Sequence, residues 1–138
     1  MALTFHPEAG TLLMCDFVGF KEPEMVKRRP VVTISGRRRR VGLLTVVPLS
    51  TTAPDPVEDH HHRMDPRSLP EHLATRPTWA KCDMVATLGM WRLDRVKIKD
   101  PSGNRRYIAP KVTADDLKAI LRGVLCAINL KALTSHVS

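Results

Sequence analysis

The stretches GTLLMCDF (10–17), PVVTIS (30–35) and VGLLTVVPL (41–49) decide the fold. Each is short and mostly apolar, and the second and third are rich in β-branched residues. This composition is typical of buried β-strands. We therefore expect three consecutive strands, the second starting at Pro30, with the arginine run 37–40 forming the turn between the last two.

Residues 53–78 differ from this pattern because they show little periodicity. Residues 51–77 hold five of the eleven prolines and three adjacent histidines, His60 to His62. We expect a long, mobile loop there, since structureless stretches of this length in small domains are usually functional or mobile. Strand character resumes at 79–88, within 90–98 and at 105–109, and a turn at 100–104 separates the last two.

The C-terminal part predicts one amphipathic helix. Thr113 is a good N-cap, and Asp115 and Asp116 suit the positive end of the helix dipole. Apolar residues then recur at helical spacing and form one stripe: Leu117, Ile120, Leu121, Val124, Leu125 and Ile128. The expected fold is mainly β with a C-terminal helix that buries this stripe against a small curled sheet, and residues 1–138 are expected to form one domain.

The charge balance points towards a polyanionic partner. The chain has 22 Lys and Arg against 14 Asp and Glu, a formal net charge of +8. Such a balance is typical of nucleic-acid-binding proteins, although a basic surface can also serve solubility or an acidic protein partner. No apolar run is long enough to span a bilayer, so no membrane contact is expected and the chain is expected in the cytoplasm. The three cysteines, which include no Cys-x-x-Cys pair, favour core packing over disulfides or chemistry.

The sequence resembles the PemK/MazF toxins of type II toxin–antitoxin systems. The resemblance rests on Glu24 before Arg29-Pro30, on the strand that follows, and on Pro48-Leu49-Ser50-Thr51 at the end of the next strand. It covers nearly the whole chain and is looser between 53 and 78. It implies an SH3-like half-open barrel with a C-terminal helix, of the PemK/MazF/CcdB kind.

The resemblance also implies an activity. Toxins of this family are metal-independent endoribonucleases that cleave single-stranded RNA such as mRNA, work as homodimers and are neutralised by a cognate antitoxin. The expected products carry a 2′,3′-cyclic phosphate. The family's catalytic arginine matches Arg29, and its catalytic threonine matches Ser50, with Thr51 one residue away. A serine therefore replaces the usual threonine.

These residue types suit the chemistry of RNA cleavage, in which the 2′-OH attacks the adjacent phosphorus. A guanidinium can donate two parallel hydrogen bonds to phosphate oxygens, so Arg29 is expected to stabilise the crowded phosphorane. Ser50 can donate to a phosphate oxygen or to the leaving 5′-oxygen, and Glu24 is a candidate base or substrate contact. The expected RNA-binding cations are Lys27, Arg28, Arg37, Arg38, Arg39 and Arg40.

Two other functions stay open at this point. One is a toxin of the same fold that poisons a protein target such as gyrase. Such a toxin needs exposed apolar residues near its own C-terminus. The other is a non-catalytic SH3-like nucleic-acid-binding module in which Arg29 is structural.

No cofactor is expected, and His60 to His62 are not expected to form a metal site, because adjacent residues in a loop converge poorly on one tetrahedral ion. Trp79 and Trp91 are expected in the core.

Overall fold

A computed structural model describes residues 3, 5–35 and 42–138. Its one α-helix in these residues is α1 (Ala114–Ala127), and the predicted mainly β architecture with a C-terminal helix is confirmed. Short 3-10 turns connect several strands: η1 Pro66–Ser68, η2 Glu71–Leu73, η3 Cys82–Met84, η4 Met90–Arg92 and η5 Lys131–His136. The strands are β1 Leu12–Cys15, β2 Arg29–Thr33, β3 Leu43–Ser50, β4 His61–Arg63, β5 Trp79–Lys81, β6 Ala86–Gly89, β7 Leu93–Asp94, β8 Val96–Lys99 and β9 Arg105–Ile108.

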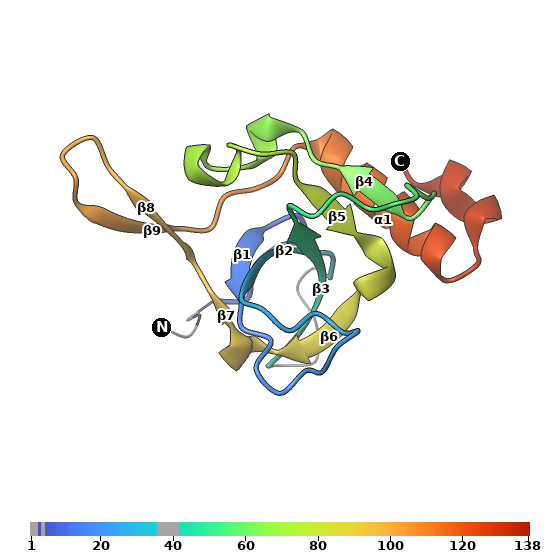
Figure 1. The fold of residues 1–138 in the computed structure, drawn as a ribbon, viewed down its shortest axis with the longest axis horizontal. Helices are drawn as coiled ribbons and strands as arrows, with labels where there is room; N and C mark the ends of the chain where they lie inside the picture. The colour runs from blue at the N-terminus through green and yellow to red at the C-terminus, as the bar shows by residue number, and fades with distance from the viewer. Residues whose placement is uncertain (1–2, 4, 36–41) are drawn as a thin grey trace.

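The strands of the main sheet pair antiparallel in the order β4-β5-β3-β2-β1-β7, and β6 pairs with β3 away from this path. The long strand β3 therefore serves two neighbours: Leu43–Val46 pair with β6, whereas Leu49 and Ser50 pair with β5. Figure 1 shows the result, a half-open barrel of curled strands with β4, β5 and α1 on one side. The hairpin of β8 and β9 extends away from this body as a separate two-stranded sheet.

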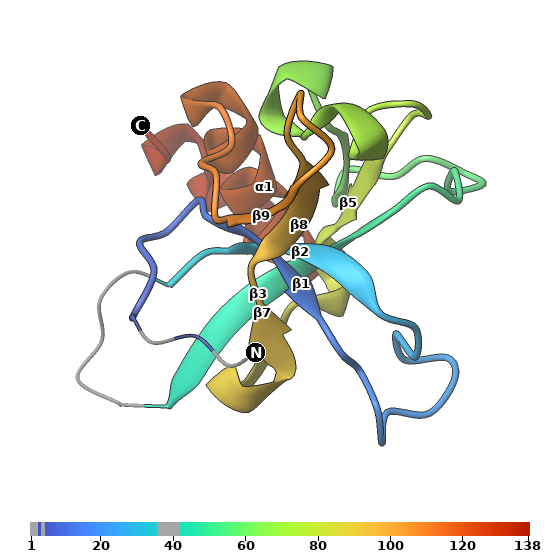
Figure 2. The ribbon, with the colours of Figure 1, turned by 90° about the vertical axis from the view of Figure 1, so that its left-hand side faces the viewer.

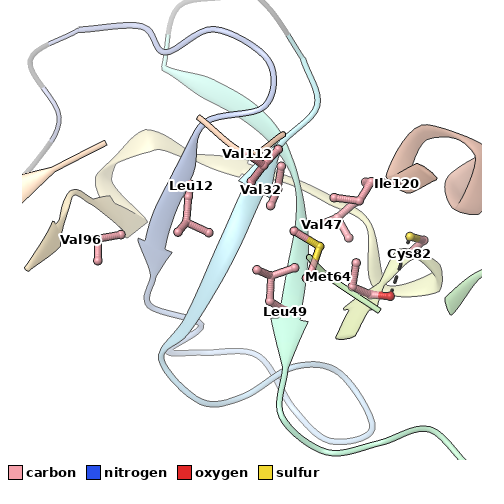
Figure 3. Close-up of a cluster of buried hydrophobic side chains, with 10 residues drawn as sticks. Leu12, Val32, Val47, Leu49, Met64, Cys82, Val96, Val112 and Ile120 are labelled. Atoms are coloured by element: carbon pink, nitrogen blue, oxygen red, sulfur yellow. Dashed lines mark hydrogen bonds between the residues drawn. The ribbon is translucent and has the colours of Figure 1, made fainter. Parts of the chain in front are cut away.

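Both faces of the central strands are buried, which explains why their sequences are almost continuously apolar. Leu13, Val31 and Val46 belong to a cluster formed by the curled strands, together with side chains from β6 and β7. Their neighbours Leu12 and Val32 point to the opposite face, where a second cluster packs against α1 through the fully buried Ile120. Figure 3 shows this second cluster.

Helix α1 begins as predicted but buries less of its stripe than expected. The Thr113 hydroxyl accepts the Asp116 N–H at 3.1 Å and caps the helix. Leu117 and Val124 pack against the core around Ile120. Ile128, however, is 53% exposed. Leu130 and Leu133, which follow the helix, are 42% and 44% exposed. The expectation that the whole stripe is covered is therefore wrong at its C-terminal end.

The segment 53–78 carries more structure than the sequence predicted. It contains β4, which pairs with β5, and the turns η1 and η2. The local sequence gives no sign of β4 because two of its three residues are histidines, and pairing with β5 is a long-range contact. Its mobility stays a prediction.

Three further expectations have different outcomes. The second strand starts at Arg29, one residue before Pro30. Trp91 is 66% exposed and lies against the Arg92 guanidinium, so its predicted place in the core is wrong. The run Arg37 to Arg40, expected to form a turn, lies outside the described residues.

Cys15 and Cys82 are fully buried, which confirms their predicted role in packing. Burial raises the pKa of each thiol to about 12, so both stay protonated and unreactive at neutral pH. Cys126 is only partly buried. In the described residues, no helix is long and apolar enough to cross a membrane.

A buried carboxylate joins segment 61–69 to the start of α1. Asp116, 3% exposed, accepts hydrogen bonds from His62 Nε2 at 2.8 Å, Ser68 Oγ at 2.5 Å and the Asp65 N–H at 3.0 Å. The Ser68 hydroxyl in turn accepts the Thr113 N–H at 2.9 Å. The charge of Asp116 is thus satisfied by three donors and by the helix N-terminus, the conditions under which a buried carboxylate is tolerated.

Substituting Asp116 by alanine should free this segment. Asp116→Ala leaves the Ser68 hydroxyl and the Asp65 N–H without their acceptor, so we expect the free energy of unfolding to fall by about 3 kcal/mol. Hydrogen exchange of amides 61–69 should accelerate as well. The control is Asp115→Ala, which removes the same charge from the exposed neighbouring position. Equal unfolding free energies for the two variants would contradict this role.

The second stability prediction concerns the close approach of α1 to η3. A Cβ placed on Gly123 would lie 2.6 Å from Cys82 Sγ and 3.2 Å from the His60 carbonyl oxygen. Alanine favours a helix by about 1 kcal/mol over glycine, but overpacking a core costs about 1–3 kcal/mol. Gly123→Ala should therefore lower the urea midpoint, and adding Cys82→Ala should recover part of the loss. A higher midpoint for Gly123→Ala alone would show that the helix can shift to accept the methyl group.

Candidate functional site

Arg29 and Ser50 stand at adjoining ends of two paired strands. The register pairs Val31 on β2 with Pro48 on β3, and two positions further along lie Arg29 and Ser50. In an antiparallel pair, residues that face each other point to the same side of the sheet. The strand ends thus bring together the two residues that the resemblance matched to the family's catalytic pair.

These two residues line a cleft of about 190 Å³. One wall comes from the ends of β2 and β3, including Thr51, and the other from the segment that follows η1. The residues that line it are Arg29, Pro30, Leu49, Ser50, Thr51, Leu69, His72, Leu73, Thr75, Arg76 and Thr78. Its lining therefore combines apolar side chains with charged and hydroxyl groups that come from both walls.

Arg29 carries a charge that the described residues do not compensate. Its Nε is buried and has no hydrogen-bond partner among them. The ion pairs found in this part of the chain also leave Arg29 out. Leaving a buried donor without an acceptor costs about 1–3 kcal/mol. A guanidinium kept in this state is ready to receive an anionic ligand.

The Ser50 hydroxyl is held in place by the backbone that follows it. Its Oγ accepts the Thr52 N–H at 3.1 Å, and the residue is 6% exposed. Because this bond uses the oxygen as an acceptor, the hydroxyl proton can be donated to an oxygen atom in the cleft. Thr51 is exposed and lines the same cleft. Its hydroxyl is a second donor close to Arg29.

Glu24 lies on the other side of Arg29. It lines a groove of about 540 Å³ together with Lys27 and Arg29, and this groove does not include Ser50. Its Oε1 accepts the Lys21 N–H at 2.7 Å, which fixes the turn 21–24. Arg29 thus separates two hollows. Arg28 is exposed on the same loop, and the other expected RNA-binding cations, Arg37 to Arg40, lie outside the described residues.

Sequence reasoning missed the residues of the second wall. His72, Thr75 and Arg76 are exposed and face the cleft that holds Arg29 and Ser50. Their segment has no periodicity, and tertiary contacts alone bring it to β2 and β3. The length of the segment was the one available signal, because long irregular stretches in small domains often carry function.

The three adjacent histidines divide between two roles. His62 binds the Asp116 carboxylate. His60 and His61 instead lie near Asp83: one ring nitrogen of each histidine and one carboxylate oxygen of Asp83 all lie within 4.8 Å of one another. The sequence did not foresee that two neighbouring histidines would converge with a third ligand. His61 Nδ1, however, accepts the Glu58 N–H at 3.0 Å. A neutral imidazole in this tautomer keeps its proton on Nε2, so it offers no lone pair to a metal.

The arrangement can bind a phosphodiester group and stabilise negative charge on it. Arg29 supplies a permanent cation, Ser50 and Thr51 supply hydroxyl donors, and His72 adds ring nitrogens that can donate or accept hydrogen bonds. None of these interactions with a phosphodiester requires a metal ion.

Several known proteins resemble the chain. The uncharacterized protein YifN of Escherichia coli (strain K12) is 28% identical over 96% of this chain and 99% of its own length. Crystalline MazF (Form-I) from Deinococcus radiodurans superimposes with a TM-score of 0.63 at 20% identity, covering 91% of this chain and 98% of that one. An endoribonuclease in complex with its cognate antitoxin, from a mycobacterial species, gives a TM-score of 0.58 at 21% identity. This match covers 90% of this chain and 96% of that one.

The structural matches confirm the fold expected from the resemblance. The model of one protein family, described as PemK-like, MazF-like toxin of type II toxin-antitoxin system, matches residues 8–125. The match includes β2, β3, the cleft at the ends of these strands and its second wall, and it extends almost to the end of α1. The chain therefore belongs to the family of PemK-like, MazF-like toxins of type II toxin-antitoxin systems.

Proposed function

We propose that this chain is an endoribonuclease that cleaves single-stranded RNA without a metal ion and is neutralised by an antitoxin. The observation that carries the proposal is the uncompensated guanidinium of Arg29 beside the Ser50 hydroxyl in one cleft. Membership of the toxin family supports it. The similar mycobacterial endoribonuclease in complex with its cognate antitoxin supports the partner.

In the proposed reaction, the 2′-oxygen of one nucleotide attacks the adjacent phosphorus. The bond from phosphorus to the 2′-oxygen forms, the bond to the 5′-oxygen breaks, and a 2′,3′-cyclic phosphate remains. Negative charge on the phosphoryl oxygens grows in the transition state, where Arg29 donates two hydrogen bonds. Ser50 donates a third, and Thr51, which lines the same cleft, binds the neighbouring phosphate.

Proton transfer is best assigned to His72. It lines the cleft with Arg29 and Ser50, whereas Glu24 lies in the groove on the far side of Arg29 and already accepts a backbone N–H. Neutral His72 takes the proton of the 2′-OH, and the leaving 5′-oxygen receives one from solvent. Glu24 then contacts the substrate, and Lys27 and Arg28 bind RNA phosphates at the edge of its groove.

The active form is a homodimer in the cytoplasm. The outermost strands of the main sheet, β4 and β7, have edges that a second copy can cover. The antitoxin is expected to present an acidic segment, because the chain has a formal net charge of +8. Such a segment would compete with RNA for Arg29.

A second candidate function is poisoning of a protein target, as in gyrase-directed toxins of this fold. The specific observation in its favour is the exposed apolar set after α1: Ile128, Leu130 and Leu133, which are 42–53% exposed. Such a surface is typical of sites that bind another protein. Incubation of purified protein with RNA decides between the two functions, since a pure protein poison leaves RNA intact.

The proposal predicts that Arg29 acts in the chemical step more than in binding. Arg29→Ala should slow single-turnover cleavage roughly 10²-fold or more, while RNA affinity changes little because many cations share the binding. Arg29→Lys should restore little, since an ammonium lacks the two-pronged geometry. Cleavage in excess EDTA should match cleavage without it. The exposed Arg122→Ala is the control. Near-normal cleavage by Arg29→Ala would move the chemistry elsewhere.

The assignment of His72 gives a separate prediction for the pH dependence. A base must be unprotonated to act, so the wild-type rate should show a limb that rises with pH. His72→Gln should lower the rate roughly 10²-fold and remove this rising limb. Glu24→Gln should keep the limb. A profile that loses its limb in Glu24→Gln and keeps it in His72→Gln would exchange the two roles.

A further inference from the structure

The hairpin of β8 and β9 projects from the barrel and carries few acidic groups. Figure 1 shows it reaching away from the body, and Figure 2 shows it beside the segment with η1 and η2. Asp100 is the one acidic residue in 96–108, and its Oδ1 accepts the Ser102 and Asn104 N–H groups within the turn. An isolated two-stranded hairpin is marginally stable in water. The stability of the fold therefore does not explain which residues the hairpin carries on its surface.

One face of the hairpin is basic and contains an exposed aromatic ring. The register pairs Lys97 with Tyr107 and Lys99 with Arg105, which places these four side chains on the same face. Tyr107 is 51% exposed and the three cations are exposed too. We call these four residues the basic face.

The charges of this face are left uncompensated. Like charges directly opposite each other on paired strands, such as Lys99 and Arg105, are destabilising. The ion pairs in the described part of the chain involve none of these three cations. A hairpin that tolerates this repulsion is suited to an anionic partner.

Two neighbouring hollows, which share lining residues, lie between the hairpin and the ends of β2 and β3. A groove of about 710 Å³ lies between β8 and η2, with Lys97 and Lys99 among its lining residues and Ile98 and Ile108 as its apolar part. His72 and Thr75 line both this groove and the cleft of Arg29 and Ser50. These shared residues direct a strand that leaves the cleft past His72 towards β8. Glu71 is the acidic residue among those that line the groove.

We propose that the basic face of the β8–β9 hairpin is a second binding site for the single-stranded RNA, beyond the point of cleavage. This inference rests on the proposed nuclease function. Lys97 and Lys99 stand two residues apart on one strand, about 6.6–6.8 Å, a spacing comparable to that of successive phosphates in an extended strand. The Tyr107 ring lies between cations and stacks on a base.

An exposed aromatic ring, and a groove that shares His72 and Thr75 with the cleft, favour RNA over an acidic protein segment. Stacking and phosphate contacts read no base edges, so this site adds affinity and lengthens the bound RNA without selecting a sequence. The hairpin is thus expected to leave the position of the cut unchanged.

The test measures RNA binding in the cleavage-deficient Arg29→Ala background. Affinity for a single-stranded RNA oligonucleotide is determined by fluorescence anisotropy over a range of salt concentrations. Replacing Lys97, Lys99 and Arg105 by Gln should weaken binding at low salt roughly tenfold or more. It should also reduce the slope of log K against log salt by about 2, since each phosphate contact contributes about 0.7 for single strands.

A single substitution tests the stacking contact. Tyr107→Leu should weaken binding roughly tenfold without changing the slope, because it removes stacking and no charge. The matched control replaces three cations of α1 and η5 by Gln: Lys118, Arg122 and Lys131. Figure 1 shows α1 on the other side of the molecule from the hairpin. With Arg29 present, the basic-face variants should cut RNA at the same positions as the wild type.

The outcomes separate this inference from the function beneath it. Equal affinities and slopes for the basic-face and control variants, with wild-type cleavage intact, would overturn the hairpin site alone. Normal RNA binding but lost antitoxin binding by the basic-face variant would also overturn it and assign the face to the protein partner. A wild type that neither binds nor cuts RNA would overturn both proposals.

Discussion

The Asp116 carboxylate is the contact on which the geometry of the cleft depends. It accepts hydrogen bonds from His62, Ser68 and the Asp65 N–H, and so fastens segment 61–69 to the start of α1. The chain that continues from this anchor supplies the wall with His72, opposite the ends of β2 and β3. Without this anchor, Arg29 and Ser50 would lie at strand ends open to solvent, where water would screen the charge of the guanidinium.

The packing of the barrel explains why the chemistry lies at the strand ends. Both faces of the central strands are filled by apolar side chains, so polar groups find room only where pairing stops. Arg29 is the first residue of β2 and Ser50 the last of β3. Rigid strands hold both side chains, and a segment of irregular structure closes over them, a common division between scaffold and site.

The sequence predicted those features that depend on local chemistry. β-Branched runs located β2 and β3, and Thr113 with the acidic residues after it located the start of α1. The resemblance located Arg29 and Ser50 before any geometry was known. It could not place His72, because contacts between residues far apart in sequence decide which part of a long irregular segment reaches the cleft. The sequence did not predict the partial exposure of Ile128 for a similar reason. Helical spacing defines an apolar stripe but not how far the sheet beneath it extends.

A crystal structure with an uncleavable substrate tests the central claim most directly. The ligand is a single-stranded RNA in which hydrogen replaces the attacking 2′-OH at the mapped cleavage position, bound to the wild-type protein. We expect the phosphate at that position to accept hydrogen bonds from the Arg29 guanidinium and the Ser50 hydroxyl, inside the wall that carries His72. A phosphate held in the groove of Glu24 and Lys27, with the cleft of Ser50 empty, would contradict it.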